Sequence, residues 1–278
     1  MYIIKANGAK EEFSPEKAKR SCLRAGASNE LANEIVKKIT RQVQQGISTR
    51  ELGRLIFRYL SKFQPSTASR YSLREALLRL GPKGFSFEKL VAMVFKEEGY
   101  KIQNNQILQG KCVPHEIDIL LEKENKFFMV ECKFHHAPGF YTEIKDVLYT
   151  WARLVDLQES SLPFKIDGVW LVSNTKFSEQ TKQYAQCRGI HLLGWAYPGE
   201  RSLQYLIESK KLYPITVLKT LEKKFEDCLI KEGIITCQEL LKIEPRTFQG
   251  KTGLDARKIS ILQSEVAYIF KNNNVIKP

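Results

Sequence analysis

Two apolar runs separated by a short polar turn stand in the middle of the chain: HEIDILL at residues 115–121 and KFFMVECKF at residues 126–134. Alternation and β-branched side chains favour β-strands in both runs. The polar residues between them predict an antiparallel hairpin that turns near Glu124-Asn125.

Charged side chains lie at matching positions of this hairpin. Side chains alternate across a strand, so Glu131 and Lys133 share one face while Cys132 points to the other. Pairing about the predicted turn sets Asp118 close to Glu131. Two carboxylates that converge repel each other unless a cation bridges them. Mg²⁺, or Mn²⁺, held by carboxylates, waters and a substrate phosphate is the occupant that suits such a site.

The flanking sequence predicts helices and further strands around this hairpin. A helix capped near Ser86 precedes it, and alternating helices and strands follow it: a helix at 141–158, a strand at 166–173, a helix at 178–188 and a strand at 190–195. This order is typical of a mixed sheet covered by helices.

Asp118 followed by Glu131-Cys132-Lys133, after a helix that bears Glu88, resembles the PD-(D/E)XK nuclease fold. Within that fold, residues 83–197 look most like the Mrr-type restriction endonucleases. The resemblance implies magnesium-dependent hydrolysis of DNA phosphodiester bonds, as in type IV restriction.

The resemblance also implies a role for each residue of the site. Asp118, Glu131 and the Cys132 carbonyl would hold the metal, and Glu88 would add a second-metal or outer contact. Lys133 would position the attacking water or stabilise developing negative charge.

In Mrr-like enzymes the next helix often presents a polar residue and a tyrosine to the active site. Lys145 and Tyr149 occupy such positions here. The alternatives are a packing tyrosine and a solvated lysine for this pair, and a plain salt bridge for Glu131 and Lys133.

Charge is unevenly distributed along the 278 residues, whose net charge is +13. Residues 1–82 carry +9, residues 83–200 carry −1, and residues 201–278 carry +5. Such a surplus favours a polyanionic partner, nucleic acid or an anionic membrane surface. We therefore expect three domains with these boundaries, an enzymatic core between two basic flanks, although lysine-rich helical surfaces are also common.

The N-terminal segment begins with a hairpin signal around Asn7-Gly8, followed by helices at 14–25 and 29–45, a helix that opens at the capping box of residues 48–51, and a helix at 66–80. It resembles the ATP cone, a module that binds adenine nucleotides in ribonucleotide reductases and some regulators. The residues that carry this resemblance are IKANG at 4–8, Glu11, Phe13, Lys17, GIST at 46–49 and ASRY at 68–71.

By this resemblance, ATP or dATP would bind among Lys5, Glu11, Ser14, Lys17 and Thr49. The alternative is a helical module that no longer binds nucleotide. The chain contains no GxxxxGK[ST] loop, which excludes a P-loop motor.

The C-terminal segment is helical in pattern and resembles the helix-hairpin-helix (SAM-like) modules of DNA-repair proteins. Glycine turns before its helices would offer backbone N–H groups to DNA phosphates. The residues expected at DNA are Gly233, Lys251, Gly253, Arg257 and Lys258. A helical bundle for dimerisation is the alternative.

Six cysteines lack any CxxC spacing, which disfavours a zinc ribbon and indicates reduced thiols. Since no apolar run reaches transmembrane length and no signal-peptide pattern opens the sequence, we expect a cytoplasmic protein without a membrane partner.

The expected fold is multidomain α+β: a helical ATP cone with an N-terminal hairpin, a restriction-endonuclease-like α/β core and an all-helical C-terminal module. The expected function is a magnesium-dependent DNA endonuclease that ATP or dATP regulates, with a change of oligomeric state as one route. The alternatives are a junction-resolving or repair nuclease and a non-catalytic, nucleotide-responsive DNA-binding protein.

Overall fold

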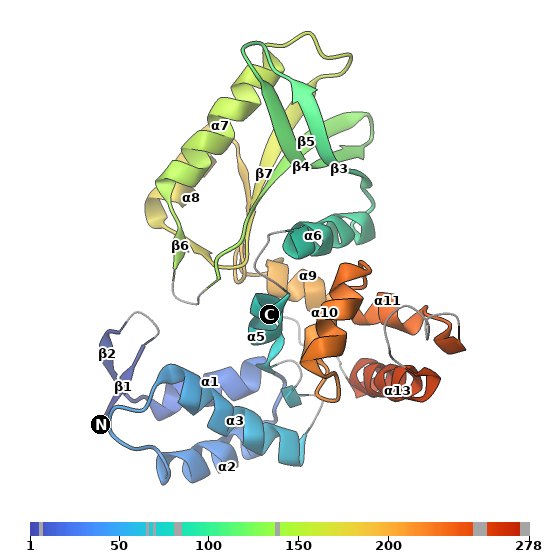
Figure 1. Ribbon diagram of the computed structural model, residues 1–278. Coiled ribbons are helices and arrows are strands. Elements are labelled where there is room, and N and C mark those ends of the chain that lie inside the picture. Colours follow the sequence, from blue (N-terminus) through green and yellow to red (C-terminus); the bar gives the residue numbers. More distant parts are fainter. Residues whose placement is uncertain are drawn as a thin grey trace. The chain divides into compact units, whose positions relative to one another are not determined.

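The structure is a computed structural model that describes residues 1–5, 8–64, 67–68, 71–80, 85–136, 140–246 and 255–272. The chain divides into two compact units. One unit joins Met1–Arg79 to Tyr213–Lys277, and the other is Leu80–Leu212. We describe each unit by itself (Figure 1).

A five-stranded sheet forms the centre of the second unit, in the order β3-β4-β5-β7-β9. Its strands are β3 (Lys101–Gln109), β4 (Pro114–Lys123), β5 (Lys126–Lys133), β7 (Ile166–Ser173) and β9 (His191–Leu193). The first three strands pair antiparallel, and β5, β7 and β9 run parallel. The predicted mixed sheet is confirmed.

The β4–β5 hairpin turns where the sequence predicts. Ile119 pairs with Val130 and Lys123 with Lys126, which leaves a two-residue loop. The loop residues Glu124 and Asn125 have φ angles of 53° and 59°. Left-handed backbone at both positions matches the twist of the flanking strands, as two-residue hairpin loops require.

Helices cover both faces of the sheet: α6 (Phe85–Glu97), α7 (Ile144–Gln158) and α8 (Glu179–Arg188). The alternation of β7 separates the two faces. Val169 and Leu171 are buried in one cluster with Leu154 of α7, whereas the Trp170 ring lies 5.3 Å from the Phe95 ring of α6. Figure 1 shows α7 and α8 together on one side of the strands and α6 on the other.

Two features of this unit differ from the sequence prediction. The sequence pattern does not predict strand β3, because its sequence KIQNNQILQ is mostly polar. Such a sequence is typical of an edge strand that buries few side chains. The helix expected from Tyr141 begins at Ile144 instead. Tyr141–Thr142 form a short strand, β6, which pairs with β8 (Lys176–Phe177), and Glu143 with Asp146 forms the capping box of α7.

The N-terminal part of the first unit combines a hairpin with helices: β1 (Tyr2–Ile4), β2 (Lys10–Glu12), α1 (Pro15–Arg24), α2 (Asn29–Thr40), α3 (Thr49–Phe63) and α5 (Leu73–Arg79). Ser14, Ser28 and Ser48 cap the first three helices with side-chain hydrogen bonds. Helix α2 ends at Thr40, five residues before the predicted end. The predicted turn residue Asn7 lies outside the described residues.

The C-terminal segment is all-helical, as predicted: α9 (Leu203–Ser209) in the second unit, and η1 (Ile215–Val217), α10 (Lys223–Lys231), α11 (Cys237–Leu241) and α13 (Ala256–Asn272) in the first. Gly233, with φ 78°, turns the chain between α10 and α11. The predicted capping box of Thr236 and Glu239 is present. None of the described helices has the length and apolar character that crossing a bilayer needs.

The C-terminal helices pack on α5 within the first unit. Thr216 Oγ1 donates to the Ala76 carbonyl oxygen at 2.7 Å. Glu226 is fully buried and pairs with Arg79 and with Lys223. The division at residues 82 and 200 stays a prediction, while the structure groups the two ends of the chain in one compact unit.

The loop before β4 is hydrogen-bonded to Asp156 of α7, and it leaves no room for a side chain at Gly110. Asp156 accepts hydrogen bonds from the backbone N–H of Cys112 at 2.8 Å and lies 2.7 Å from His115 Nε2. A Cβ on Gly110 would overlap Asp156 Oδ2 and lie 2.6 Å from the Val113 carbonyl oxygen.

We therefore expect Gly110→Ala to lower the free energy of unfolding by about 1–3 kcal/mol, the usual cost of overpacking. Gly199→Ala is the matched control, because a Cβ there meets nothing within 4 Å. The check is the thermal unfolding midpoint of each variant. Equal midpoints for the two variants would show that the Gly110 loop relaxes freely.

Candidate active site

The β4–β5 hairpin brings together the three residues that the sequence singled out. Asp118 Oδ2 accepts a hydrogen bond of 2.7 Å from the backbone N–H of Cys132. Lys133 Nζ donates to Glu131 Oε1 at 2.6 Å. Asp118, Glu131 and Lys133 therefore form one cluster across two paired strands.

Glu131 is only 5% exposed, so its charge needs partners inside the protein. Lys133 takes one oxygen of this carboxylate, and Arg153 Nη1 of α7 donates to the other, Oε2. Arg153 Nη2 also donates to the Glu116 carbonyl oxygen. Arg153 Nε is buried and has no hydrogen-bond partner among the described atoms.

Burial and mutual repulsion raise the pKa values of the other two acids. The pKa of Asp118 rises to about 6, first because of burial and then because of the Glu131 charge. The pKa of Glu88 on α6 rises to about 7 because of burial and then the charges of Asp118, Glu116 and Glu131. Glu88 is therefore coupled electrostatically to the acids of the cluster.

The donor set suits a hard divalent cation. Carboxylate and carbonyl oxygens are the ligands that Mg²⁺ prefers, with waters and substrate completing the shell. No three His, Cys, Asp or Glu side chains among the described residues gather closely enough to enclose an ion. The protein groups of this cluster that have the chemistry of Mg²⁺ ligands are the Asp118 and Glu131 carboxylates and the Cys132 carbonyl.

The two predicted secondary residues occupy different surroundings. The Tyr149 ring lies 5.6 Å from Lys133 Nζ and 5.3 Å from the Arg153 guanidinium carbon, so it adjoins the cluster. Lys145 is exposed one turn earlier on α7. Burial raises the pKa of the Cys132 thiol well above its usual value, which fits a packing side chain and not a nucleophile.

In the N-terminal segment, three of the predicted nucleotide residues contact each other. Glu11 forms ion pairs with both Lys5 and Lys17, and these bonds lower the pKa of Glu11 to about 2. Ser14 caps α1 by accepting from the Lys17 N–H at 3.2 Å. Thr49 is the first residue of α3.

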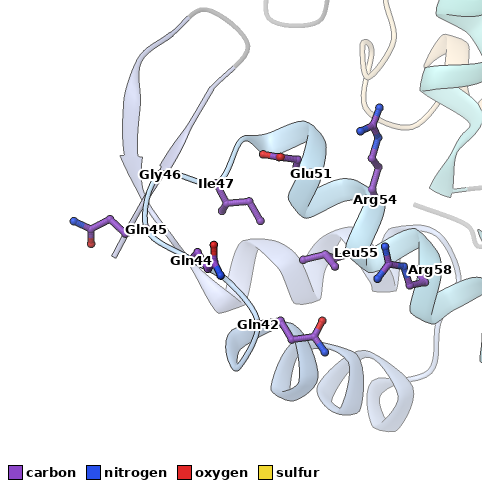
Figure 2. Close-up of a pocket in the computed structure, with 9 residues that line it drawn as sticks. All are labelled: Gln42, Gln44, Gln45, Gly46, Ile47, Glu51, Arg54, Leu55 and Arg58. Atoms are coloured by element: carbon purple, nitrogen blue, oxygen red, sulfur yellow. The ribbon is translucent and has the colours of Figure 1, made fainter.

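A hollow of about 480 Å³ lies elsewhere in this segment, between α3 and the loop before it (Figure 2). Its lining comprises Gln42, Gln44, Gln45, Gly46, Ile47, Glu51, Arg54, Leu55 and Arg58. The five residues predicted to bind nucleotide are not among them, although Thr49 lies in the chain between the lining residues Ile47 and Glu51.

The predicted DNA-contacting residues of the C-terminal segment are only partly described. Gly233 forms the turn between α10 and α11, and Arg257 is exposed on α13. Lys258 lies over the Phe225 ring at 4.5 Å. Lys251 and Gly253 lie outside the described residues.

Arg153 is the site residue that the sequence analysis missed. It reaches Glu131 from a helix 22 positions along the chain. The available signal was an arginine four residues after Tyr149, at a position where helical spacing places it on the buried face of α7 with Thr150 and Leu157.

Three sequence families match the chain, in the order of its segments. Residues 1–77 match the ATP cone domain, residues 81–195 match a family described as restriction endonuclease, and residues 213–270 match AF1548-like, C-terminal. The predicted resemblances to an ATP cone and an Mrr-type nuclease domain are confirmed.

An uncharacterized protein of Archaeoglobus fulgidus is 39% identical over 168 residues, which are 60% of this chain and 92% of the relative. The crystal structure of AF1548, a protein of unknown function, is similar at a TM-score of 0.57 and 36% identity, covering 67% of this chain and 98% of that one. The restriction endonuclease MspJI, solved with a 27-mer oligonucleotide, reaches a TM-score of only 0.33, with 14% identity and 46% and 29% of the two chains covered, which is too low to support an inference.

The raised pKa values of Asp118 and Glu88 predict a pH dependence of stability. Both groups hold protons in the native state at pH values where the unfolded chain has lost them. Protonation of these two groups therefore stabilises the native state fully below about pH 4. This stabilisation is lost as the pH rises through about 6 for Asp118 and about 7 for Glu88.

In the presence of EDTA, we expect Asp118→Asn and Glu88→Gln to gain thermal stability relative to wild type as pH rises from about 4 to 8, because each amide removes a buried charge. The measurement is the difference in unfolding midpoint between each variant and wild type across that range. A difference that does not change with pH would contradict the raised pKa values.

Proposed function

Since the chain belongs to the same family as AF1548 and contains ATP-cone and restriction-endonuclease domains, we propose that it is a divalent-metal-dependent endodeoxyribonuclease that an adenine nucleotide regulates. The observation that carries this proposal is the cluster of Asp118, Glu131 and Lys133 on the β4–β5 hairpin, away from its two-residue loop.

Each member of the cluster has a distinct chemical role in this proposal. Asp118 and Glu131, with the Cys132 carbonyl, hold Mg²⁺ or Mn²⁺. The metal, when bound, lowers the pKa of a water and offsets charge on the phosphoryl group. Lys133 is 29% exposed and positions that water or stabilises the charge that develops on the phosphate oxygens.

Glu88 and Tyr149 support the reaction from the edge of the cluster. Glu88, with a pKa near 7, exchanges a proton near neutral pH and suits an outer or second-metal contact. Tyr149 is 56% exposed over the two cations and offers a ring surface to substrate. Lys145, exposed on the same helix, adds positive charge for a phosphate.

DNA is the proposed substrate because the central segment is flanked by two basic segments. The proposed contacts to phosphates are Gly233 in the turn between α10 and α11, Arg257 and Lys258 on α13, and Lys251 and Gly253. A junction-resolving or repair nuclease uses the same chemistry, so branched DNA belongs among the substrates tested.

We expect purified full-length protein to nick or cut plasmid DNA with Mg²⁺ and not with EDTA. Lys133→Ala should slow cleavage by about 100-fold or more, because it removes the cation that stabilises developing charge. Binding to duplex DNA should survive in this variant.

Lys111→Ala is the matched control, because Lys111 is 60% exposed and pairs with Glu159 outside the cluster. Cleavage by this variant should equal that of wild type. Binding of DNA without cleavage of any supercoiled, linear, methylated or branched substrate would instead support the non-catalytic DNA-binding alternative.

For the ATP cone, we propose that the phosphates of ATP or dATP bind Lys5 and Lys17 in exchange for Glu11. Both lysines are close to half exposed or more, and they share one carboxylate that a polyphosphate can replace. Thr49, at the start of α3, and Ser14 lie in the matched cone segment as further hydroxyl contacts.

Lys17→Ala should weaken ATP or dATP binding about tenfold, since a charge-assisted hydrogen bond contributes about 1.5 kcal/mol. Calorimetric titration of the full chain measures this affinity. Lys37→Ala, an exposed lysine of α2, should bind like wild type. Equal affinities of the Lys17 and Lys37 variants would exclude the proposed phosphate site.

A further inference from the structure

Arg153 is a buried cation whose contacts are fixed at several points. Its side chain is 7% exposed, and its two Nη atoms donate to Glu131 Oε2 and to the Glu116 carbonyl oxygen. The guanidinium carbon lies 5.3 Å from the centre of the Tyr149 ring. Arg153 thereby joins α7 to both strands of the hairpin.

The two cationic side chains that pair with Glu131 differ in conformational freedom. Lys133 is 29% exposed and contacts Glu131 through a single ammonium at the end of a flexible stem. Arg153 contacts it through a planar fork whose other arm is bound to the backbone of β4. A guanidinium held in this way keeps its direction, whereas an ammonium turns to a new anion at little cost.

Substrate binding would therefore affect the Lys133–Glu131 contact and the Arg153–Glu131 contact differently. A phosphodiester that approaches Lys133 competes with Glu131 Oε1 for the ammonium. The contact from Arg153 to Oε2 would remain, because its surroundings are buried and already bonded. The orientation of the Glu131 carboxylate thus depends on Arg153 once Lys133 turns to substrate.

We propose that Arg153 is a positioning residue that holds the Glu131 carboxylate in the orientation required to bind the divalent cation. This inference rests on the proposed nuclease function and adds a residue that neither the motif nor the family matches identify. Groups that orient metal ligands from outside typically change metal affinity by about 10- to 100-fold when they are removed.

The test is calorimetric titration of Mn²⁺ into the full chain without DNA. We expect Arg153→Met to weaken Mn²⁺ binding by about 10-fold or more. Arg153→Lys should recover part of the affinity, because it keeps the charge but cannot contact Glu131 and the Glu116 carbonyl together. The matched control is Arg188→Met, an exposed arginine of α8 that lies over the Trp151 ring at 5.2 Å.

Unchanged or tighter Mn²⁺ binding by a folded Arg153→Met variant overturns the inference. If circular dichroism shows that this variant does not fold, Arg153→Lys decides, and wild-type affinity in it overturns the inference equally. If wild type itself binds no Mn²⁺, the proposed function and the inference both fail. If wild type binds Mn²⁺ and cleaves DNA while Arg153→Met binds as well as wild type, only the positioning role fails.

Discussion

A carboxylate buried at the end of a central strand needs opposite charge close by, and this need organises the middle of the protein. Glu131 is almost completely buried, and its two carboxylate oxygens pair with Lys133 and with Arg153. The requirement fixes how α7 lies on the sheet, since the arginine must reach across to both hairpin strands. Burial, and then the charge of Glu131 and the other nearby carboxylates, raises the pKa values of Asp118 and Glu88.

The register of the hairpin is the second condition for this arrangement. A shift of one residue would move Glu131 to the opposite face of the sheet and separate it from Arg153. The two left-handed residues of the loop, Glu124 and Asn125, allow only a two-residue turn and therefore pin the register. The geometry of the site thus depends on this short loop, although the loop lies at the other end of the two strands.

Local patterns predicted the elements that form this site. The alternation of HEIDILL and KFFMVECKF was sufficient to place Asp118 beside Glu131, and cap residues such as Ser48 and Thr236 marked helix starts correctly. Strand β3 was missed because an edge strand buries few side chains and has no apolar pattern. Arg153 was missed for a different reason: its contact with Glu131 is tertiary, and no spacing along the chain encodes it. The packing of Thr216 and Glu226 on α5 is equally long-range, so sequence composition separated segments that the structure groups together.

Because the two ends of the chain form one compact unit, the two units are expected to fold in a particular order during synthesis. Residues 80–212 are continuous and form a sheet whose strands are all synthesised before residue 213 leaves the ribosome. The first unit is discontinuous, because the contacts of Ala76 and Arg79 wait for Thr216 and Glu226. Since domains fold as they emerge during synthesis, the central unit is expected to be complete while the unit that contains the cone is still open. In each newly made molecule, the contacts that join α5 to the C-terminal helices then form only after the sheet that bears the acidic cluster has been synthesised.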